Sequence, residues 1–134
     1  MTGSLLLDTN AVIRMVGQPD RIPVTVRERL VSPATELFLS AASAWEVATK
    51  TRSGRLPGGD VLVSTWTEIM DRLRVTQLAI ETEDALIAGG LHWEHRDPFD
   101  RMIVAQAQRR ALAVVTSDRM ILGSGLVGVV EIGG

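Results

Sequence analysis

The chain has 134 residues, of which 46% are hydrophobic and 22% are charged, and it contains no cysteine. This length and composition predict one domain over residues 1–134, with an apolar core of ordinary size. The absence of cysteine excludes a disulfide scaffold, a thiolate zinc site and a cysteine nucleophile. A formal net charge of −2 argues against a broadly basic protein that coats nucleic acid. No apolar run approaches the roughly 18 residues of a membrane span, so we expect a cytoplasmic protein without membrane contact.

The first half of the chain alternates short apolar runs with helical patterns. Residues 4–7 form an apolar run that ends at Asp8, which is typical of a strand buried on both faces. A short helix over 10–16 follows, and Pro23 opens a second helix. We expect that second helix over 24–31, a strand over 37–40 and a helix over 42–52.

The second half continues the alternation. A helix over 61–72 leads to a short strand over 75–78, and acids crowd the first turn of a helix over 81–91. Asp97 and Pro98 open a helix that runs to about residue 110. A strand over 113–117 stops at Asp118, and a weak final strand is expected over 127–132. Strands that alternate with helices predict an α/β domain with a mostly parallel central sheet flanked by helices.

Five acidic residues fall where such a sheet binds ligands. In an open parallel sheet, ligands bind outside the carboxyl ends of the strands. Asp8 and Asp118 directly follow strands, and Glu46 lies early in the helix after the second strand. Asp100, with Asp97 three residues before it, begins the helix that returns to the fourth strand. We therefore expect Asp8, Glu46, Asp100 and Asp118 to converge, with Asp97 close by.

Each acid also has a structural explanation. Ser43 and Glu46 fit a capping box, in which the glutamate reaches back to a backbone N–H. Asp97, which precedes a proline, fits a helix N-cap. Asp8 and Asp118 fit turn or cap positions as well, so no single acid identifies a site.

The acids as a set favour a metal site. Carboxylates gathered in a partly dry cleft repel one another, and two neighbouring arginines, Arg101 and Arg119, are candidates to neutralise them. The other solution is a hard divalent cation, because oxygen ligands without cysteine or histidine suit Mg²⁺ or Mn²⁺ rather than zinc. The two histidines, His92 and His95, are too few for a histidine metal cluster. A carboxylate pocket with such ions is typical of phosphodiester cleavage.

Four segments carry a family resemblance. In this order and spacing, LLLDTNAVIRM, SAASAWEVATK, HRDPFDRMIVAQA and AVVTSDRMI resemble the PIN-domain family, and within it the VapC-type toxins of bacterial toxin–antitoxin pairs. The acids of the family match Asp8, Glu46, Asp100 and Asp118. Asp97 also occurs in members with the DPFD form, as a ligand or as a cap. Polar residues that flank these positions are candidates to hold the acids: Thr9, Asn10, Ser43, and Thr116 or Ser117.

The resemblance implies a PIN-like fold and an activity. It implies an endoribonuclease that depends on Mg²⁺, with Mn²⁺ as a substitute, and that cuts structured RNA of the translation apparatus. It also implies a homodimer and a small VapB-type antitoxin, which blocks the acidic pocket and brings operator DNA binding. Apolar residues around Trp45, Val47 and Trp66 are either core or a surface for such a partner.

Two alternative hypotheses have some support in the sequence. A haloacid-dehalogenase-type phosphatase also has an aspartate after its first strand, but its second aspartate would stand where this chain has Asn10. The alternative from another class is a PIN-fold module without catalysis that serves for binding or as a scaffold. A metal-dependent RNA cleavage assay separates that module from the nuclease.

Overall fold

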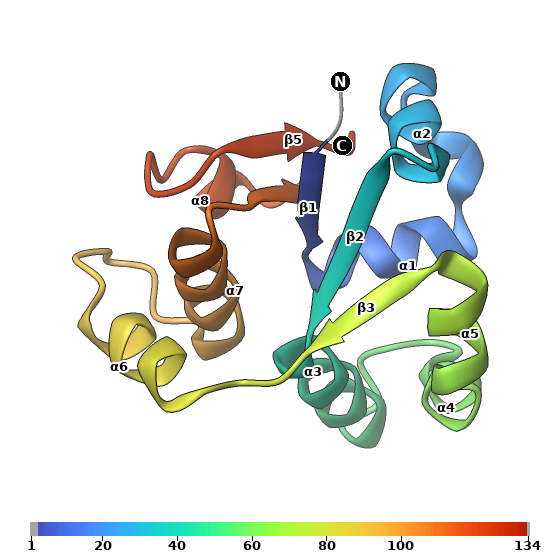
Figure 1. Ribbon diagram of the computed structural model, residues 1–134. Coiled ribbons are helices and arrows are strands. Elements are labelled where there is room, and N and C mark those ends of the chain that lie inside the picture. Colours follow the sequence, from blue (N-terminus) through green and yellow to red (C-terminus); the bar gives the residue numbers. More distant parts are fainter. Residues whose placement is uncertain (1–2, 134) are drawn as a thin grey trace.

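Five parallel strands form one central sheet with helices on both sides (Figure 1). The computed structural model describes residues 3–133. The strand order is β3-β2-β1-β4-β5, and in this register Leu7 of β1 lies opposite Leu39 of β2 and Val115 of β4. The predicted α/β class with a parallel sheet is confirmed. The strands are β1 (Gly3–Leu7), β2 (Thr35–Ser40), β3 (Val75–Leu78), β4 (Ala113–Thr116) and β5 (Val129–Glu131).

The helices follow the prediction with two differences. The expected helix over 61–72 is two helices, because the backbone leaves helical geometry at Thr65, whose hydroxyl donates to the Val61 carbonyl at 2.7 Å. A four-residue helix after Asp118 was not predicted. The helices are α1 (Thr9–Gly17), α2 (Val24–Val31), α3 (Ala41–Arg52), α4 (Gly59–Ser64), α5 (Trp66–Leu73), α6 (Thr82–Gly90), α7 (Pro98–Arg110) and α8 (Arg119–Leu122), with a 3-10 helix η1 (Pro19–Arg21).

The three leucines of β1 divide the core between the two faces of the sheet. Leu5 and Leu7 pack with residues of α1, α2 and α5, whereas Leu6 packs with residues of α7 and α8. Successive strand residues point to opposite faces, so a continuous leucine run belongs to a strand that is covered on both sides. Each fully buried leucine contributes roughly 1.5–3 kcal/mol of transfer free energy. This burial holds β1 at the centre of the sheet.

The topology brings several segments together at the carboxyl edge of the sheet, where open α/β folds form a crevice. The strand order reverses between β1 and β4, which is the switch point at which open α/β sheets bind ligands. Helices α1, α3 and α8 begin directly after β1, β2 and β4, and α7 begins at the same edge before it leads back to β4. Four segments that are distant in the sequence therefore meet there. Within residues 3–133, no helix is long and apolar enough to cross a membrane.

Candidate active site

Asp8 is buried at the switch point and is held from two sides. It directly follows β1 and caps α1, where its Oδ1 accepts from the backbone N–H of Ala11 at 2.7 Å. Its Oδ2 accepts from the hydroxyl of Thr116 on the neighbouring strand β4. The oxygen of that hydroxyl in turn accepts from the backbone N–H of Asp118 at 2.9 Å. Thr116 thus joins the two acids across the crevice.

Asp118 lies on the other side of this crevice and caps α8. Its Oδ1 accepts from the backbone N–H of Met120 at 2.8 Å, so the unpredicted short helix is what orients it. The predicted cap role of Asp118 is confirmed, and one carboxylate oxygen has no hydrogen bond to the residues 3–133 that the structure describes.

Glu46 reaches the site from α3. It is buried, and its Oε1 accepts from the hydroxyl of Thr9 at 2.6 Å, while its Oε2 pairs with Lys50 Nζ at 2.6 Å. The predicted capping box is wrong, because α3 begins at Ala41 and Ser40 is its N-cap. Glu46 therefore lies in the second turn and turns its carboxylate toward the acids. Ser43 contacts the Thr9 hydroxyl at 3.0 Å.

Asp97 and Asp100 have different roles at the start of α7. Asp97 is the N-cap, as predicted, and its Oδ1 accepts from the backbone N–H groups of Phe99 at 2.9 Å and Asp100 at 3.2 Å. The Oδ2 of Asp100 lies 2.6 Å from Nε2 of His95. His95 was not expected at the site, because two histidines are too few for a histidine cluster. Its signal in the sequence is its position, two residues before the cap, in the segment that leads into the site.

The two arginines expected to neutralise the acids do not do so. Arg101 directs its guanidinium to main-chain carbonyl groups. Arg119 is exposed and forms no ion pair with an acid within residues 3–133. Among the lysines and arginines of that range, only Lys50 pairs with a carboxylate of the site, that of Glu46. The mutual repulsion of the acids is therefore largely uncompensated by these cations.

The electrostatics of the site reflect this crowding. Burial raises the pKa of Asp8 to about 6 against the hydrogen bonds from Thr116 and Ala11, and the nearby charges of Asp100 and Asp118 raise it further. Burial likewise raises the pKa of Asp100 to about 6 against the hydrogen bond from His95. The charges of Asp97, Asp118 and Glu46 add to that rise. Asp8, Glu46, Asp100 and Asp118 thus lie close enough for their charges to act on one another, as expected, and their role as metal ligands stays a prediction.

The donor chemistry of these acids fits a hard cation. Carboxylate and hydroxyl oxygens are the groups that Mg²⁺ and Mn²⁺ prefer, and a bound cation would stabilise the carboxylates whose pKa burial and neighbouring charges raise. One ligand atom from each of His95, Asp97 and Asp100 lies within 4.8 Å of the others.

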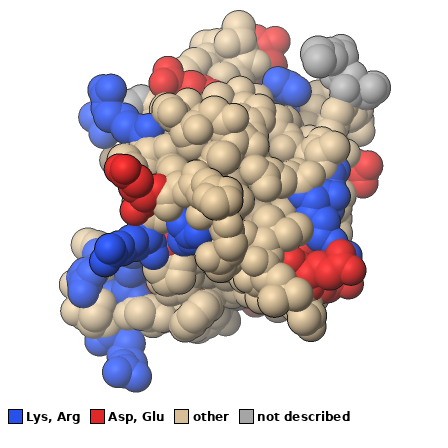
Figure 2. All heavy atoms as spheres, turned by 90° about the vertical axis from the view of Figure 1, so that its left-hand side faces the viewer, with Lys and Arg blue, Asp and Glu red and all other residues tan. Residues whose placement is uncertain are grey.

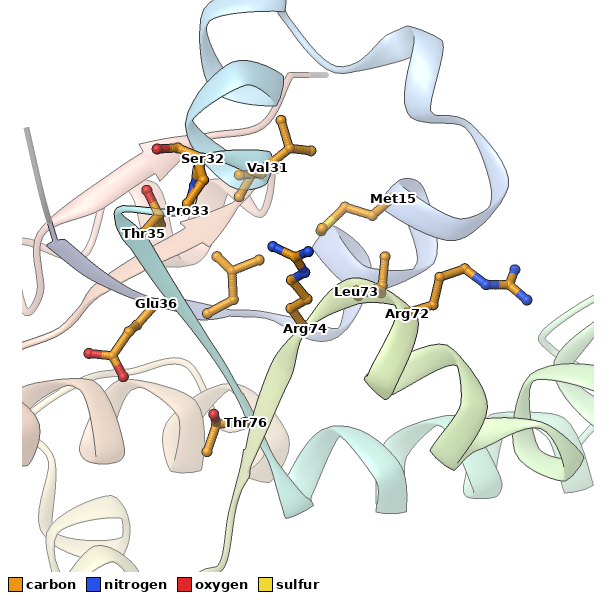
Figure 3. Close-up of a pocket in the computed structure, with 12 residues that line it drawn as sticks. Met15, Val31, Ser32, Pro33, Thr35, Glu36, Arg72, Leu73, Arg74 and Thr76 are labelled. Carbon is orange, nitrogen blue, oxygen red and sulfur yellow. The ribbon is translucent and has the colours of Figure 1, made fainter.

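A cavity lies away from the acids. Figure 3 shows this cavity of about 490 Å³ between the ends of α1, α2 and α5 and the first residues of β2 and β3. That is the amino-terminal edge of the strands, opposite to the acidic crevice. Its lining includes Met15, Leu30, Leu37, Leu73, Arg72 and Arg74.

On the face shown in Figure 2, charged side chains are scattered. On the face of α6 and α7 shown in Figure 2, lysine and arginine side chains form separate patches, and uncharged residues occupy the middle. Of the apolar residues singled out from the sequence, Val47 is core and Trp66 is partly buried against the core. Trp45 is 59% exposed, and its ring meets the ring of Phe99 edge-on at 4.8 Å between centroids.

Residues 5–122 match the family model described as the PIN domain. The chain belongs to the PIN-domain family. The match spans the acids Asp8, Glu46, Asp100 and Asp118, so the fold and the acidic crevice lie within the shared region. The resemblance read from the four sequence segments is therefore confirmed at the level of the family. No curated protein sequence is significantly similar to the chain.

Solved structures of toxin–antitoxin proteins have the same fold. The chain resembles VapBC2 of Rickettsia felis, bound to a DNA fragment from its promoter, with a TM-score of 0.69, 13% identity and coverage of 96% and 98% of the two chains. It resembles VapBC-1 of nontypeable Haemophilus influenzae with a TM-score of 0.64, 18% identity and coverage of 96% and 97%. It also resembles FitAcB of Neisseria gonorrhoeae with a TM-score of 0.56, 22% identity and coverage of 93% and 95%.

Proposed function

We propose that this PIN-domain protein is a VapC-type toxin that cleaves RNA phosphodiester bonds with the help of Mg²⁺ or Mn²⁺. The observation that carries the proposal is the meeting of Asp8, Glu46, Asp100 and Asp118 at the switch point. Burial and mutual repulsion raise the pKa of two of these acids. Such an arrangement destabilises the folded protein unless a bound ligand stabilises the carboxylates. Structural similarity to VapBC complexes supports the toxin subclass.

These four carboxylates would hold the cation. A divalent cation, when bound, polarises the scissile phosphate and neutralises the charge that develops on it. Thr116 sets the spacing of Asp8 and Asp118, while Thr9 and Lys50 orient Glu46. His95 orients Asp100 by binding one of its two oxygens. Asp97 keeps one oxygen on the helix N-terminus and has its Oδ2 available.

We further infer the partners of such a toxin. A VapB-type antitoxin would neutralise the chain, and operator DNA would be bound only through that antitoxin. The structural neighbours named above include a VapBC complex on promoter DNA, which supports this arrangement. The toxin itself would act in the cytoplasm as a homodimer on an RNA substrate, without a membrane.

A cleavage assay with a matched control tests the proposal. Purified protein is incubated with structured RNA in Mg²⁺, in Mn²⁺ and in excess EDTA. We expect cleavage only with metal, and a loss of orders of magnitude for Asp8→Asn, which keeps the side-chain shape and removes the charge. Asp20→Asn makes the same chemical change on a fully exposed side chain in η1 and should cleave normally. Cleavage that persists in EDTA, or in Asp8→Asn, would refute the metal mechanism.

A further inference from the structure

The guanidinium of Arg101 is bound entirely by main-chain carbonyl groups. An arginine side chain carries five N–H donors, and here Nε makes one hydrogen bond while Nη1 and Nη2 make two each. The distances run from 2.8 to 3.4 Å. Arg101 forms no ion pair with an acid among residues 3–133. The five acceptors are the carbonyl oxygens of Ala88, Gly89, Leu91, Trp93 and His95.

These carbonyls belong to the end of α6 and to the segment that connects it to α7. The last carbonyls of a helix have no partner within the helix and carry partial negative charge. A cation that binds them there replaces a cap. The connecting residues 91–97 form no helix or strand, so their own backbone supplies little order. Arg101, one turn into α7, therefore ties this irregular segment to a regular helix.

The segment that Arg101 holds carries the histidine of the site. The His95 carbonyl is one of the five acceptors, and the His95 ring lies 2.6 Å from the Asp100 carboxylate. The Trp93 ring packs against the His95 ring at 4.8 Å between centroids, and the Trp93 carbonyl also accepts from Arg101. The imidazole is thus fixed through its own backbone and through its neighbour.

We propose that Arg101 is a positioning residue of the active site, which holds residues 91–95 by their carbonyl groups and thereby seats His95 against Asp100. The catalytic part of this inference rests on the proposed nuclease function. The positioning part rests on the geometry alone.

A second set of contacts supplies the control. Arg110 and Arg109 also join α7 to α6, but they bind the buried carboxylate of Asp84 and the carboxylate of Glu81 at the other end of the helix pair. Loss of a donor there weakens the packing of α6 on α7 without freeing the segment 91–95. Arg110→Lys is therefore matched to Arg101→Lys in chemistry and in the helices that it joins.

Cleavage kinetics test the catalytic part. Arg101→Lys keeps the charge but gathers its donors on one nitrogen, which cannot reach five carbonyls. We expect kcat to fall about 10–100-fold, as for residues that orient metal ligands, with KM nearly unchanged. When Arg101→Lys is added to His95→Ala, kcat should fall by less than a further ~3-fold. The effects of two residues that act through one contact are not additive. Arg110→Lys should keep kcat. Full additivity, or an unchanged kcat in Arg101→Lys, overturns the proposal.

Backbone relaxation by NMR in EDTA tests the positioning part independently of RNA cleavage. In the wild type and in Arg110→Lys, residues 91–96 should have order parameters of about 0.85, as in a rigid backbone, and in Arg101→Lys they should fall below about 0.6. Flexible residues 91–96 in the wild type overturn the proposal even if Arg101→Lys does not fold. A wild type that cleaves no RNA but shows this rigidity refutes the nuclease function and leaves the positioning role standing.

Discussion

Replacing Asp8 by asparagine should stabilise the metal-free protein at neutral pH. Asp8 is 3% exposed, and burial is the largest cause of its raised pKa. Asparagine keeps the size of the side chain and an oxygen that can accept from Ala11. It loses the acceptor for the Thr116 hydroxyl, because an amide NH₂ stands in its place.

The magnitude follows from the pKa of Asp8. Its ordinary value is 3.8 and its value in the folded protein is about 6. At about 1.4 kcal/mol per pKa unit, the ionised carboxylate lowers the free energy of unfolding by ~3 kcal/mol. Between these two pKa values the folded state binds more protons than the unfolded state, so the stability of the wild type falls as pH rises from about 4 to 6. The asparagine of the variant does not titrate, and rearranging the Thr116 hydrogen bond costs about 1 kcal/mol at every pH.

Chemical denaturation in EDTA at pH 4 and at pH 8 measures this difference. Asp8→Asn should be slightly less stable than the wild type at pH 4, where the loss of the Thr116 hydrogen bond dominates. At pH 8 it should be about 2 kcal/mol more stable, because removing the ionised carboxylate outweighs that loss. Saturating Mn²⁺ at pH 8 should reverse that order, because only the wild type keeps the full set of ligands. The fully exposed Asp20 provides the control, and Asp20→Asn should show no such gain. A stability difference that does not change between the two pH values would refute the account of Asp8.

Three further predictions concern metal, cap and partner. Mn²⁺ at 100 times its dissociation constant should raise the free energy of unfolding of the wild type by about 2.7 kcal/mol; identical thermal melts in EDTA and in Mn²⁺ would contradict the site. Asp97→Asn should fold and cleave almost normally because asparagine also caps, whereas Asp97→Ala should lose about 1 kcal/mol of unfolding free energy; an inactive but stable Asp97→Asn would make Asp97 a ligand. An antitoxin should place an arginine near Asp8 and Asp118, since its fork pairs with carboxylates. Replacing that arginine by glutamine should weaken inhibition more than binding, and undiminished inhibition would mean steric blocking alone.

The sequence by itself determined most of the elements and the edge of the sheet at which the acids lie. Proline and glycine positions and short apolar runs predicted strands and helices within a few residues, as at 24–31 and 75–78. The acids were predictable because parallel topology brings the carboxyl ends of all strands to one edge, whatever the details of packing. For Asp8 and Asp118, which stand within two residues of a strand end, the position in the sequence was enough to place them at this edge.

Tertiary structure alone decided how Glu46 and Asp100 are held. The pairing of Glu46 with Thr9 depends on how α3 lies on α1, and the contact of His95 with Asp100 depends on an irregular segment without periodicity. Arg101 follows Asp100 in the sequence, yet its side chain binds no acid among residues 3–133 and donates hydrogen bonds to carbonyl groups at the end of α6. Sequence spacing shows which residues share an edge of the sheet, but a hydrogen bond depends on side-chain direction, which is set by packing between segments distant in the chain.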